Sequence, residues 1–327
     1  MWESGGHTIV FASNRGATLA QRNTDGGQWS IYVIGINGRG LRRVTPPDGC
    51  RDEDPVPSPN GDEIAFVRSC ASSSAGDLMV VSSGGGTPKR LAARLDGFQP
   101  TTELAWSPDG RLIAYPRIRD PVDPNSPDDL WTAEAATGRL RRLAQAVGGF
   151  AWSHHGRKIA FGCGGGSLCV RDMRSGTTRR PPRQFPAGNG ASSVTWSADD
   201  KQLAFVDGSG GSYEPNYSAW VVMSSDGERA YRLPRYGEGN VDNIQWLPRH
   251  PQVLVIESDQ GVYLVHADGT RHANLSGEIY YGWAASPDGK ELLFVRTVYD
   301  SSGSYYRSAI SLANLDTGQT QQLTQSR

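Results

Sequence analysis

The sequence is short of the features that mark most enzymes and membrane-spanning proteins. It has no Gly-x-Ser-x-Gly elbow, no His-Glu-x-x-His zinc motif and no Gly-x-x-x-x-Gly-Lys phosphate loop. No apolar run approaches the roughly 18 residues of a membrane-spanning helix, and the first residues lack the pattern of a signal peptide. These absences favour a non-catalytic chain over an enzyme, with no membrane insertion.

Charge of one sign is not in excess either. The formal net charge is −1, and binding to a phosphate backbone normally needs a basic face. We therefore expect no nucleic-acid partner, and we expect a monomer. Lysine is nearly absent, with 4 lysines against 29 arginines, which is typical of a GC-rich bacterial genome.

What the chain does contain is one short unit, repeated along its whole length. In the clearest copy, Ser107-Pro108-Asp109-Gly110 separates two apolar stretches. Proline presets the first corner of a turn, aspartate bonds its own backbone and glycine accepts a positive φ, so this tetrapeptide predicts a tight hairpin. The turn position recurs seven times, 39 to 55 residues apart, at Gly6, Gly61, Gly110, Gly156, Asp200, His250 and Gly289.

Each unit continues with a third strand, a glycine-rich turn and a short basic strand such as Leu140–Leu143. A repeat of this length with four strands is the signature of a propeller blade. We predict an all-β fold, a β-propeller with seven blades of about four antiparallel strands, with six blades as the alternative. Arginines suit the outermost strand, because charge on an exposed edge discourages edge-to-edge pairing.

The units fill a single predicted domain, 1–327, with approximate limits 1–50, 51–95, 96–145, 146–185, 186–236, 237–276 and 277–327. The first unit opens at Trp2, where its innermost strand should end. We therefore expect the first blade to lack its innermost strand and the sequence to be a fragment of a longer protein.

The pattern Trp-Ser-Pro-Asp-Gly-x-x-Ile-Ala-Phe, followed by a strand, a glycine-rich turn and Arg-Arg-Leu, resembles the PD40 (WD40-like) repeat of TolB-type β-propellers. The resemblance covers essentially the whole chain and implies the fold, whereas that repeat serves binding proteins, receptor ectodomains and gating domains of peptidases. The family's namesake resembles a six-bladed propeller behind a separate α/β domain. This chain shows seven units and no such domain.

The four cysteines fall in two local pairs. Cys163 and Cys169 bracket a predicted hairpin turn, and Cys50 and Cys70 lie at connections on one face of a propeller. The hairpin pair is within plausible disulfide reach, we expect the other pair to be bonded as well, and no Cys-x-x-Cys spacing points to zinc. Two disulfides indicate an oxidising compartment, so we expect an extracytoplasmic protein that is secreted, periplasmic or at the cell surface.

Extra length is concentrated in the connections of one predicted face, the long-loop face. Its segments are Asn14–Gln28, Pro46–Pro55, Arg117–Asp129, Asp207–Ser218, Arg235–Asp242 and Arg296–Arg307. Tyrosine and arginine are enriched at binding hot spots, although tyrosines also pack loops onto a scaffold. The candidate ligand-binding residues on this face are Tyr213, Tyr217, Tyr236, Tyr299, Tyr305, Tyr306, Arg117, Arg119, Arg296 and Arg307.

Two acidic stretches are weaker candidates. Asp120, Asp123, Asp128 and Asp129 are carboxylates of the kind that binds Ca²⁺, but their loop has three prolines and lacks the Asp-x-Asn-x-Asn-Gly spacing. A solvated loop is the favoured interpretation, and Asp52-Glu53-Asp54 is interpreted in the same way. We predict no cofactor, with Ca²⁺ as the weak alternative.

The sequence thus predicts a non-catalytic, extracytoplasmic binding or sensor propeller that recognises a protein or glycan ligand on the long-loop face. It would suit the ectodomain of a larger membrane protein. Two alternatives stay open. One is a propeller enzyme, a lyase or hydrolase with a central-channel site, or the gating propeller of a peptidase. The other is a purely structural module of an envelope complex.

Overall fold

A computed structural model describes most of the chain and shows strands throughout. The described residues are 1–3, 5–14, 28–70, 76–95, 104–119, 128–163, 167–180, 191–208, 218–234, 241–258, 261–274, 281–299 and 306–324. The chain divides into two compact units, Met1–Gln145 with Thr297–Arg327, and Ala146–Arg296. Within the described residues, no helix is long and apolar enough to cross a membrane.

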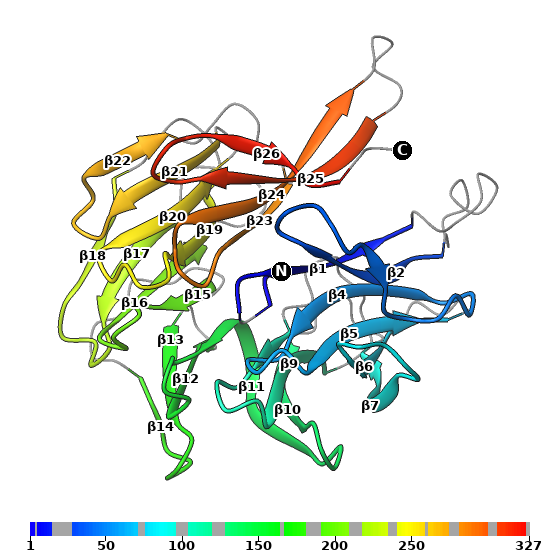
Figure 1. The fold of residues 1–327 in the computed structure, drawn as a ribbon. Coiled ribbons are helices and arrows are strands. Elements are labelled where there is room, and N and C mark those ends of the chain that lie inside the picture. The colour runs from blue at the N-terminus through cyan, green and yellow to red at the C-terminus, as the bar shows by residue number, and fades with distance from the viewer. Residues whose placement is uncertain are drawn as a thin grey trace. The chain divides into compact units, whose positions relative to one another are not determined.

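The first unit holds the earlier strands of the chain, coloured blue to green in Figure 1. A three-stranded sheet, β1-β2-β3, precedes a four-stranded sheet, β4-β5-β6-β7. The strands of the first two sheets are β1 (Thr8–Ser13), β2 (Ser30–Gly35), β3 (Arg42–Arg43), β4 (Arg51–Pro57), β5 (Glu63–Ser69), β6 (Gly76–Ser82) and β7 (Lys89–Leu95). The next sheet begins with β8 (Ala105–Trp106), β9 (Leu112–Ile118) and β10 (Asp128–Glu134).

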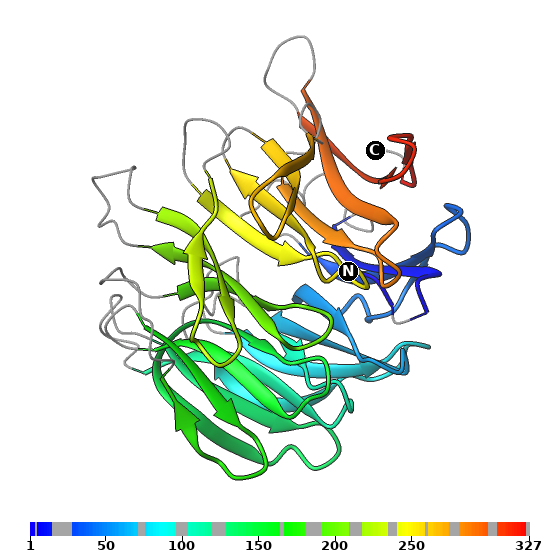
Figure 2. The same ribbon diagram turned by 90° about the vertical axis from the view of Figure 1, so that its left-hand side faces the viewer.

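One long strand, β11 (Leu140–Trp152), is the last strand of the third sheet and the first strand of the fourth, so continuous hydrogen bonding joins β8 to β14 in one seven-stranded sheet. The remaining sheets are four-stranded and run in chain order, as Figure 2 shows for the green to yellow strands. The seven-stranded sheet ends with β12 (Lys158–Cys163), β13 (Ser167–Asp172) and β14 (Thr178–Arg179). The four-stranded sheets that follow hold β15 (Ala191–Trp196), β16 (Gln202–Gly208), β17 (Ser218–Ser224), β18 (Ala230–Arg232), β19 (Val241–Trp246), β20 (Val253–Ser258), β21 (Gly261–His266), β22 (Arg271–Asn274), β23 (Tyr281–Ala285), β24 (Glu291–Tyr299), β25 (Tyr306–Asn314) and β26 (Thr320–Gln322).

This succession is an all-β, seven-bladed propeller, as the repeat predicts. The first sheet has three strands, and Trp2 forms only a single bridge with Ile9 where an innermost strand would pair. The predicted lack of an innermost strand is therefore confirmed. The basic strands β3 and β14 lie at sheet edges and are exposed along their length, as is the uncharged edge strand β26, whereas Leu140–Leu143 belongs to β11 within the seven-stranded sheet.

The predicted turn chemistry is also present. Ser107 Oγ donates to Asp109 Oδ1 (2.5 Å) and accepts from the Leu112 amide (2.9 Å), while Asp109 Oδ1 accepts from the Arg111 amide (3.1 Å). Gly110 has a φ of 69°, and Asp200 takes the same left-handed conformation at 56°. In the degenerate sixth copy the positive φ moves to Arg249, at 62°.

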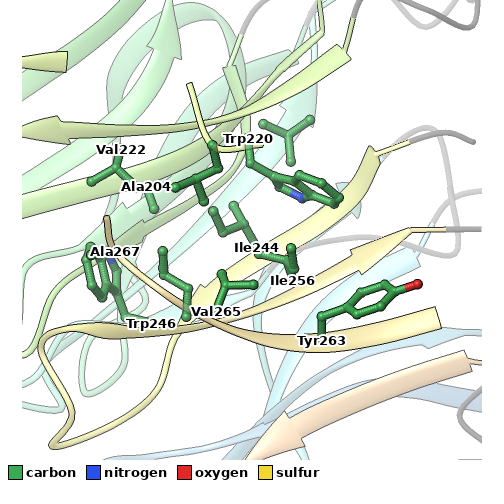
Figure 3. Packing of buried hydrophobic residues seen from close by; sticks show 12 residues of the cluster. Ala204, Trp220, Val222, Ile244, Trp246, Ile256, Tyr263, Val265 and Ala267 are labelled. Atoms are coloured by element: carbon green, nitrogen blue, oxygen red, sulfur yellow. The ribbon is translucent and has the colours of Figure 1, made fainter. Parts of the chain in front are cut away.

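Hydrophobic cores lie between consecutive sheets of a unit. In the second unit, Trp220 and Val222 of β17 pack with Ile244 and Trp246 of β19 and with Ile256 of β20 (Figure 3). Strands buried on both faces explain the uninterrupted apolar stretches that flank each turn.

The repeated tryptophan of β8, β15 and β19 allows a matched test of one hydrogen bond. Trp196 Nε1 donates to the Ala151 carbonyl (3.1 Å), as Trp106 Nε1 does to that of Val56 (2.9 Å). Trp246 Nε1 has no partner among the described residues, although Trp246 is 3% exposed and Trp196 2%. We expect Trp196→Phe to cost about 1–2 kcal/mol more than Trp246→Phe in urea unfolding, because only the former breaks a buried bond. Equal losses in the free energy of unfolding would mean that the cavity left by the smaller phenylalanine ring, and not the hydrogen bond, determines the cost.

Both predicted disulfides are present. Cys50 and Cys70 are 4.3 Å apart between Cα atoms, and Cys163 and Cys169 are 5.8 Å apart. The first ties the segment entering β4 to the end of β5, and the second ties β12 to β13 across their hairpin.

Candidate functional site

Most of the predicted ligand-binding residues, or their side chains, lie outside the part of the chain that the structure describes. Tyr213, Tyr217, Tyr236 and Tyr305 lie outside the described residues. The backbones of Arg296 and Tyr299 belong to β24, and those of Tyr306 and Arg307 belong to β25, while their side chains lie outside the described part. For these residues, binding stays a prediction.

The two described arginines of the set both contact their own sheet. The Arg117 guanidinium lies over the Trp131 ring, 5.5 Å from its centroid. Arg119 Nη2 donates to Asp129 Oδ1 (2.6 Å), and Arg142 Nη1 donates to Asp129 Oδ2 (3.3 Å). These contacts hold the ends of β9 and β10 in place, which a packing role already explains.

The weak Ca²⁺ candidates are only partly described. Asp120 and Asp123 lie outside the described residues, whereas Asp128 and Asp129 begin β10. Both Asp129 oxygens already accept from guanidinium groups. Burial and the neighbouring Asp129 raise the pKa of Asp128. Across the residues with described positions, no three His, Cys, Asp or Glu side chains are grouped as metal ligands.

The most unusual polar arrangement is instead on β4, the first strand of the second sheet. A β-bulge interrupts its pairing with β5 between Glu53 and Val56. Asp54, the first bulged residue, has a φ of 50°, a left-handed conformation that costs a non-glycine residue free energy. Bulges re-aim side chains and are frequent beside functional sites. Ser193 of β15 takes the equivalent conformation, with a φ of 47°.

Several polar groups surround this bulge, and we call Gln28, Trp29, Arg51, Glu53 and Asp54 the β4 bulge site. Arg51 Nη2 contacts Glu53 Oε1 (2.5 Å), and its guanidinium lies 5.5 Å from the centroid of the Trp29 ring. Trp29 and Arg51 also form a parallel bridge, which places the chain before β2 beside the start of β4.

Buried polar atoms of the β4 bulge site lack a hydrogen-bond partner among the described residues. These include Glu53 Oε2, Asp54 Oδ2 and Gln28 Nε2. Buried polar atoms almost always have partners, and leaving one without costs about 1–3 kcal/mol. Two acceptors on β4 and one donor just before β2 therefore lack a described partner, and hydroxyl or amine groups brought within reach would satisfy the acceptors.

The side chain of Arg68 in β5 connects that strand to β4 and to the segment before β4, and we call these contacts the Arg68 clamp. Arg68 donates from Nε to Asp52 Oδ1 (2.6 Å), from Nη2 to Asp52 Oδ2 (2.9 Å) and from Nη1 to Asp48 Oδ2 (2.9 Å). The Asp52 side chain is 1% exposed. The Cys50–Cys70 disulfide closes the same region.

The Arg68 clamp shows that one interpretation made from the sequence is wrong. The pattern Asp52-Glu53-Asp54 indicates a solvated loop, but the three residues lie in β4 and Asp52 is fully buried. The reason is the bidentate Arg68 contact, because a charge is buried when an opposite charge satisfies its oxygens.

Asp54 is electrostatically distinct. Burial raises the pKa of its carboxyl to about 6, and the Glu53 charge adds to this while the Arg51 charge opposes it. The folded protein therefore holds the Asp54 proton up to about pH 6, whereas the unfolded chain releases it near its ordinary pKa of about 3.9.

A raised folded-state pKa means that stability falls as pH rises from about 4 to about 6. Asp54→Asn removes this charge and keeps a residue that tolerates positive φ. We expect the variant to be more stable than the parent at pH 7.5, by about 1–2 kcal/mol after allowance for solvent screening, and equal to it near pH 4. Urea unfolding across pH 4 to pH 8 measures the difference. The exposed Glu228→Gln is the control, and a constant offset between parent and Asp54→Asn at all pH values would contradict the expectation.

Comparisons with known proteins support the fold and the resemblance of the repeat. No family model matches the chain. The Tol-Pal system protein TolB of Rhizorhabdus wittichii is 35% identical over 83 residues, which are 25% of this chain and 18% of that protein. This chain therefore matches less than a fifth of the relative's length. The partial match and the seven-bladed fold are consistent with a TolB-type PD40 propeller.

Several solved structures share the fold. An oligogalacturonate lyase in complex with manganese has a TM-score of 0.66 at 15% identity, over 96% of this chain and 87% of that one. Prolyl oligopeptidase B from Galerina marginata has a TM-score of 0.69 at 12% identity, over 100% of this chain and 50% of that one. Pyrococcus horikoshii acylaminoacyl peptidase has 0.63 at 13%, over 98% and 50%. At such identities the likeness shows the fold alone.

Proposed function

We propose that this chain is an extracytoplasmic binding propeller that recognises a protein or glycan ligand with the long-loop end of its sheets. The observation that carries the proposal is the β4 bulge site, in which Glu53, Asp54 and Gln28 each have a buried polar atom without a partner among the described residues. Gln28 ends one predicted long-loop segment, and Glu53 and Asp54 belong to another.

The location rests on the two disulfides. Cys50–Cys70 and Cys163–Cys169 use all four cysteines of the chain. Structural disulfides persist in oxidising compartments and are rare in the cytosol. The Cys50–Cys70 disulfide also lies beside the β4 bulge site. An oxidising compartment, which preserves this disulfide, therefore also preserves the covalent tie next to the site.

The test compares one double variant with a matched control. The parent protein is screened by surface plasmon resonance against an immobilised glycan library and a set of purified envelope proteins. Glu53→Gln with Asp54→Asn should weaken the captured interaction at least tenfold, since neutral amides, each with a donor NH2 group, replace both carboxylates. Asp62→Asn with Glu228→Gln, which removes two exposed charges, should change it less than twofold.

Tyr305→Ala with Tyr306→Ala tests the predicted tyrosine contribution. Weaker binding at an unchanged melting temperature supports direct contact, whereas a lower melting temperature with unchanged binding means that the tyrosines pack their loop. A captured ligand whose affinity survives both the β4 variant and the tyrosine variant contradicts the proposal.

A propeller enzyme is the second candidate, and Asp54 is the observation that favours it. A carboxyl with a pKa of about 6 exchanges protons near neutral pH, as a general acid or base must. Incubating the parent with any bound glycan or peptide and analysing the products by mass spectrometry separates the two functions. Cleavage abolished by Asp54→Asn favours the enzyme, and intact ligand favours binding.

A further inference from the structure

A second site lies in the other unit, at the edge of the fourth sheet. A groove of about 490 Å³ opens where the outer strands β13 and β14 approach the turn that follows β17. Apart from Val170, which is largely buried, the described lining residues are of polar or charged types. The lining residues are Lys158, Val170, Asp172, Ser175, Thr177, Arg179, Arg180, Ser225 and Asp226.

The two carboxylates of the groove are occupied by their own turns. Asp172 Oδ1 accepts from the amides of Arg174 (3.0 Å) and Ser175 (2.7 Å) and from Ser175 Oγ (3.0 Å). Asp226 Oδ1 accepts from Ser224 Oγ (2.5 Å) and from the Glu228 amide (3.0 Å). These bonds lower the pKa of both carboxyls, so the acids serve to shape the turns that border the groove.

Lys158, which lies across from Asp172 in the pairing of β12 with β13, acts on that carboxyl only at longer range, where its charge helps to lower the pKa of Asp172. Among the described residues, neither Lys158 nor Arg179 is within salt-bridge distance of a carboxylate. Residues 157–180 hold six basic side chains and a single acidic one, in a chain whose net charge is −1. The basic residues are Arg157, Lys158, Arg171, Arg174, Arg179 and Arg180.

We propose that this groove binds an anionic glycan, one that carries carboxylate or sulfate groups. Lys158 and Arg179 would pair with the anionic groups, and the hydroxyls of Ser175, Thr177 and Ser225 would bond the sugar hydroxyls. The volume is in the range of small-ligand sites.

The residues that line the groove favour a glycan over other polyanionic ligands. Single-stranded nucleic acids are held by aromatic side chains on which bases stack, and none of the described residues that line the groove is aromatic. A membrane surface is met by apolar side chains that insert between lipids, and the lining residues of this concave site offer only Val170, which is largely buried.

Three polymers with one backbone test the proposal: dextran, carboxymethyl dextran and dextran sulfate. Binding to the full chain is measured by biolayer interferometry at several salt concentrations. We expect binding to one or both charged polymers and none to dextran. Lys158→Gln with Arg179→Gln should weaken this binding at least tenfold and flatten its salt dependence. The matched control, Arg139→Gln with Lys290→Gln, removes two exposed cations elsewhere and should change binding less than twofold.

Phosphatidylglycerol vesicles and single-stranded DNA complete the test. The glycan assignment is overturned if either binds more tightly than the charged dextrans and is lost in the same double variant. The groove assignment is overturned if none of the charged dextrans binds, or if the control variant loses as much affinity as Lys158→Gln with Arg179→Gln. Equal melting temperatures of the two double variants exclude unfolding as the cause.

Discussion

Asp52→Ala should be among the most destabilising single substitutions in this protein. The Arg68 guanidinium donates two hydrogen bonds to Asp52, and the two side chains are 11% and 1% exposed. Removing one member of a buried ion pair leaves the other charge without compensation, which costs about 3–5 kcal/mol. Urea unfolding of the oxidised protein at pH 7.5 measures this loss.

The bond from Arg68 to Asp48 provides the matched control. Asp48 accepts from the same guanidinium at 2.9 Å, but its side chain is 37% exposed. Water can replace it, so Asp48→Ala should cost less than about 1 kcal/mol. Asp52→Leu with Arg68→Met removes both charges and should recover most of the stability that Asp52→Ala loses. Similar small losses for Asp52→Ala and Asp48→Ala would show that Arg68 reaches solvent once Asp52 is gone.

The fold was predictable because its determinants are local. Ser107, Asp109 and Gly110 build their turn from atoms within five residues, and the repeat copies this chemistry along the chain. The cysteine pairs are local too, at separations of 20 and 6 residues. Even Asp200, which replaces the turn glycine, keeps the left-handed conformation because the surrounding hairpin demands it.

The candidate site was not predictable in the same way, because it depends on partners that are distant in sequence. Asp52 has the sequence context of an acidic loop until Arg68, 16 residues later, accounts for its burial. Burial and the Glu53 charge raise the pKa of Asp54, at a bulge that only the pairing of β4 with β5 reveals. Conversely, Arg117 and Arg119 look like ligand-binding arginines in the sequence, and the structure gives them Trp131 and Asp129 as contacts.

The close packing of β12 against β15 should make Gly162→Ala strongly destabilising. Gly162 of β12 lies against the backbone of Ala191 in the next sheet. A Cβ at Gly162 would lie 3.1 Å from the Ala191 amide nitrogen and closer still to its carbonyl oxygen, below any distance that real Cβ atoms show. Backbone atoms held in a ladder cannot move aside cheaply, so we expect a loss of about 3 kcal/mol or more in urea unfolding.

Gly84→Ala is the control for this substitution. A Cβ there would meet only Ser82 Oγ, at an ordinary 3.5 Å, and alanine in place of glycine lowers the entropy of the unfolded chain. Its stability should therefore change by less than about 1 kcal/mol, in either direction. If Gly162→Ala is as mild as Gly84→Ala, the fourth and fifth sheets can separate by the width of a methyl group without loss. If it is severe, glycine at position 162 is required by the close approach of β12 to β15, a contact that no local pattern in the sequence encodes.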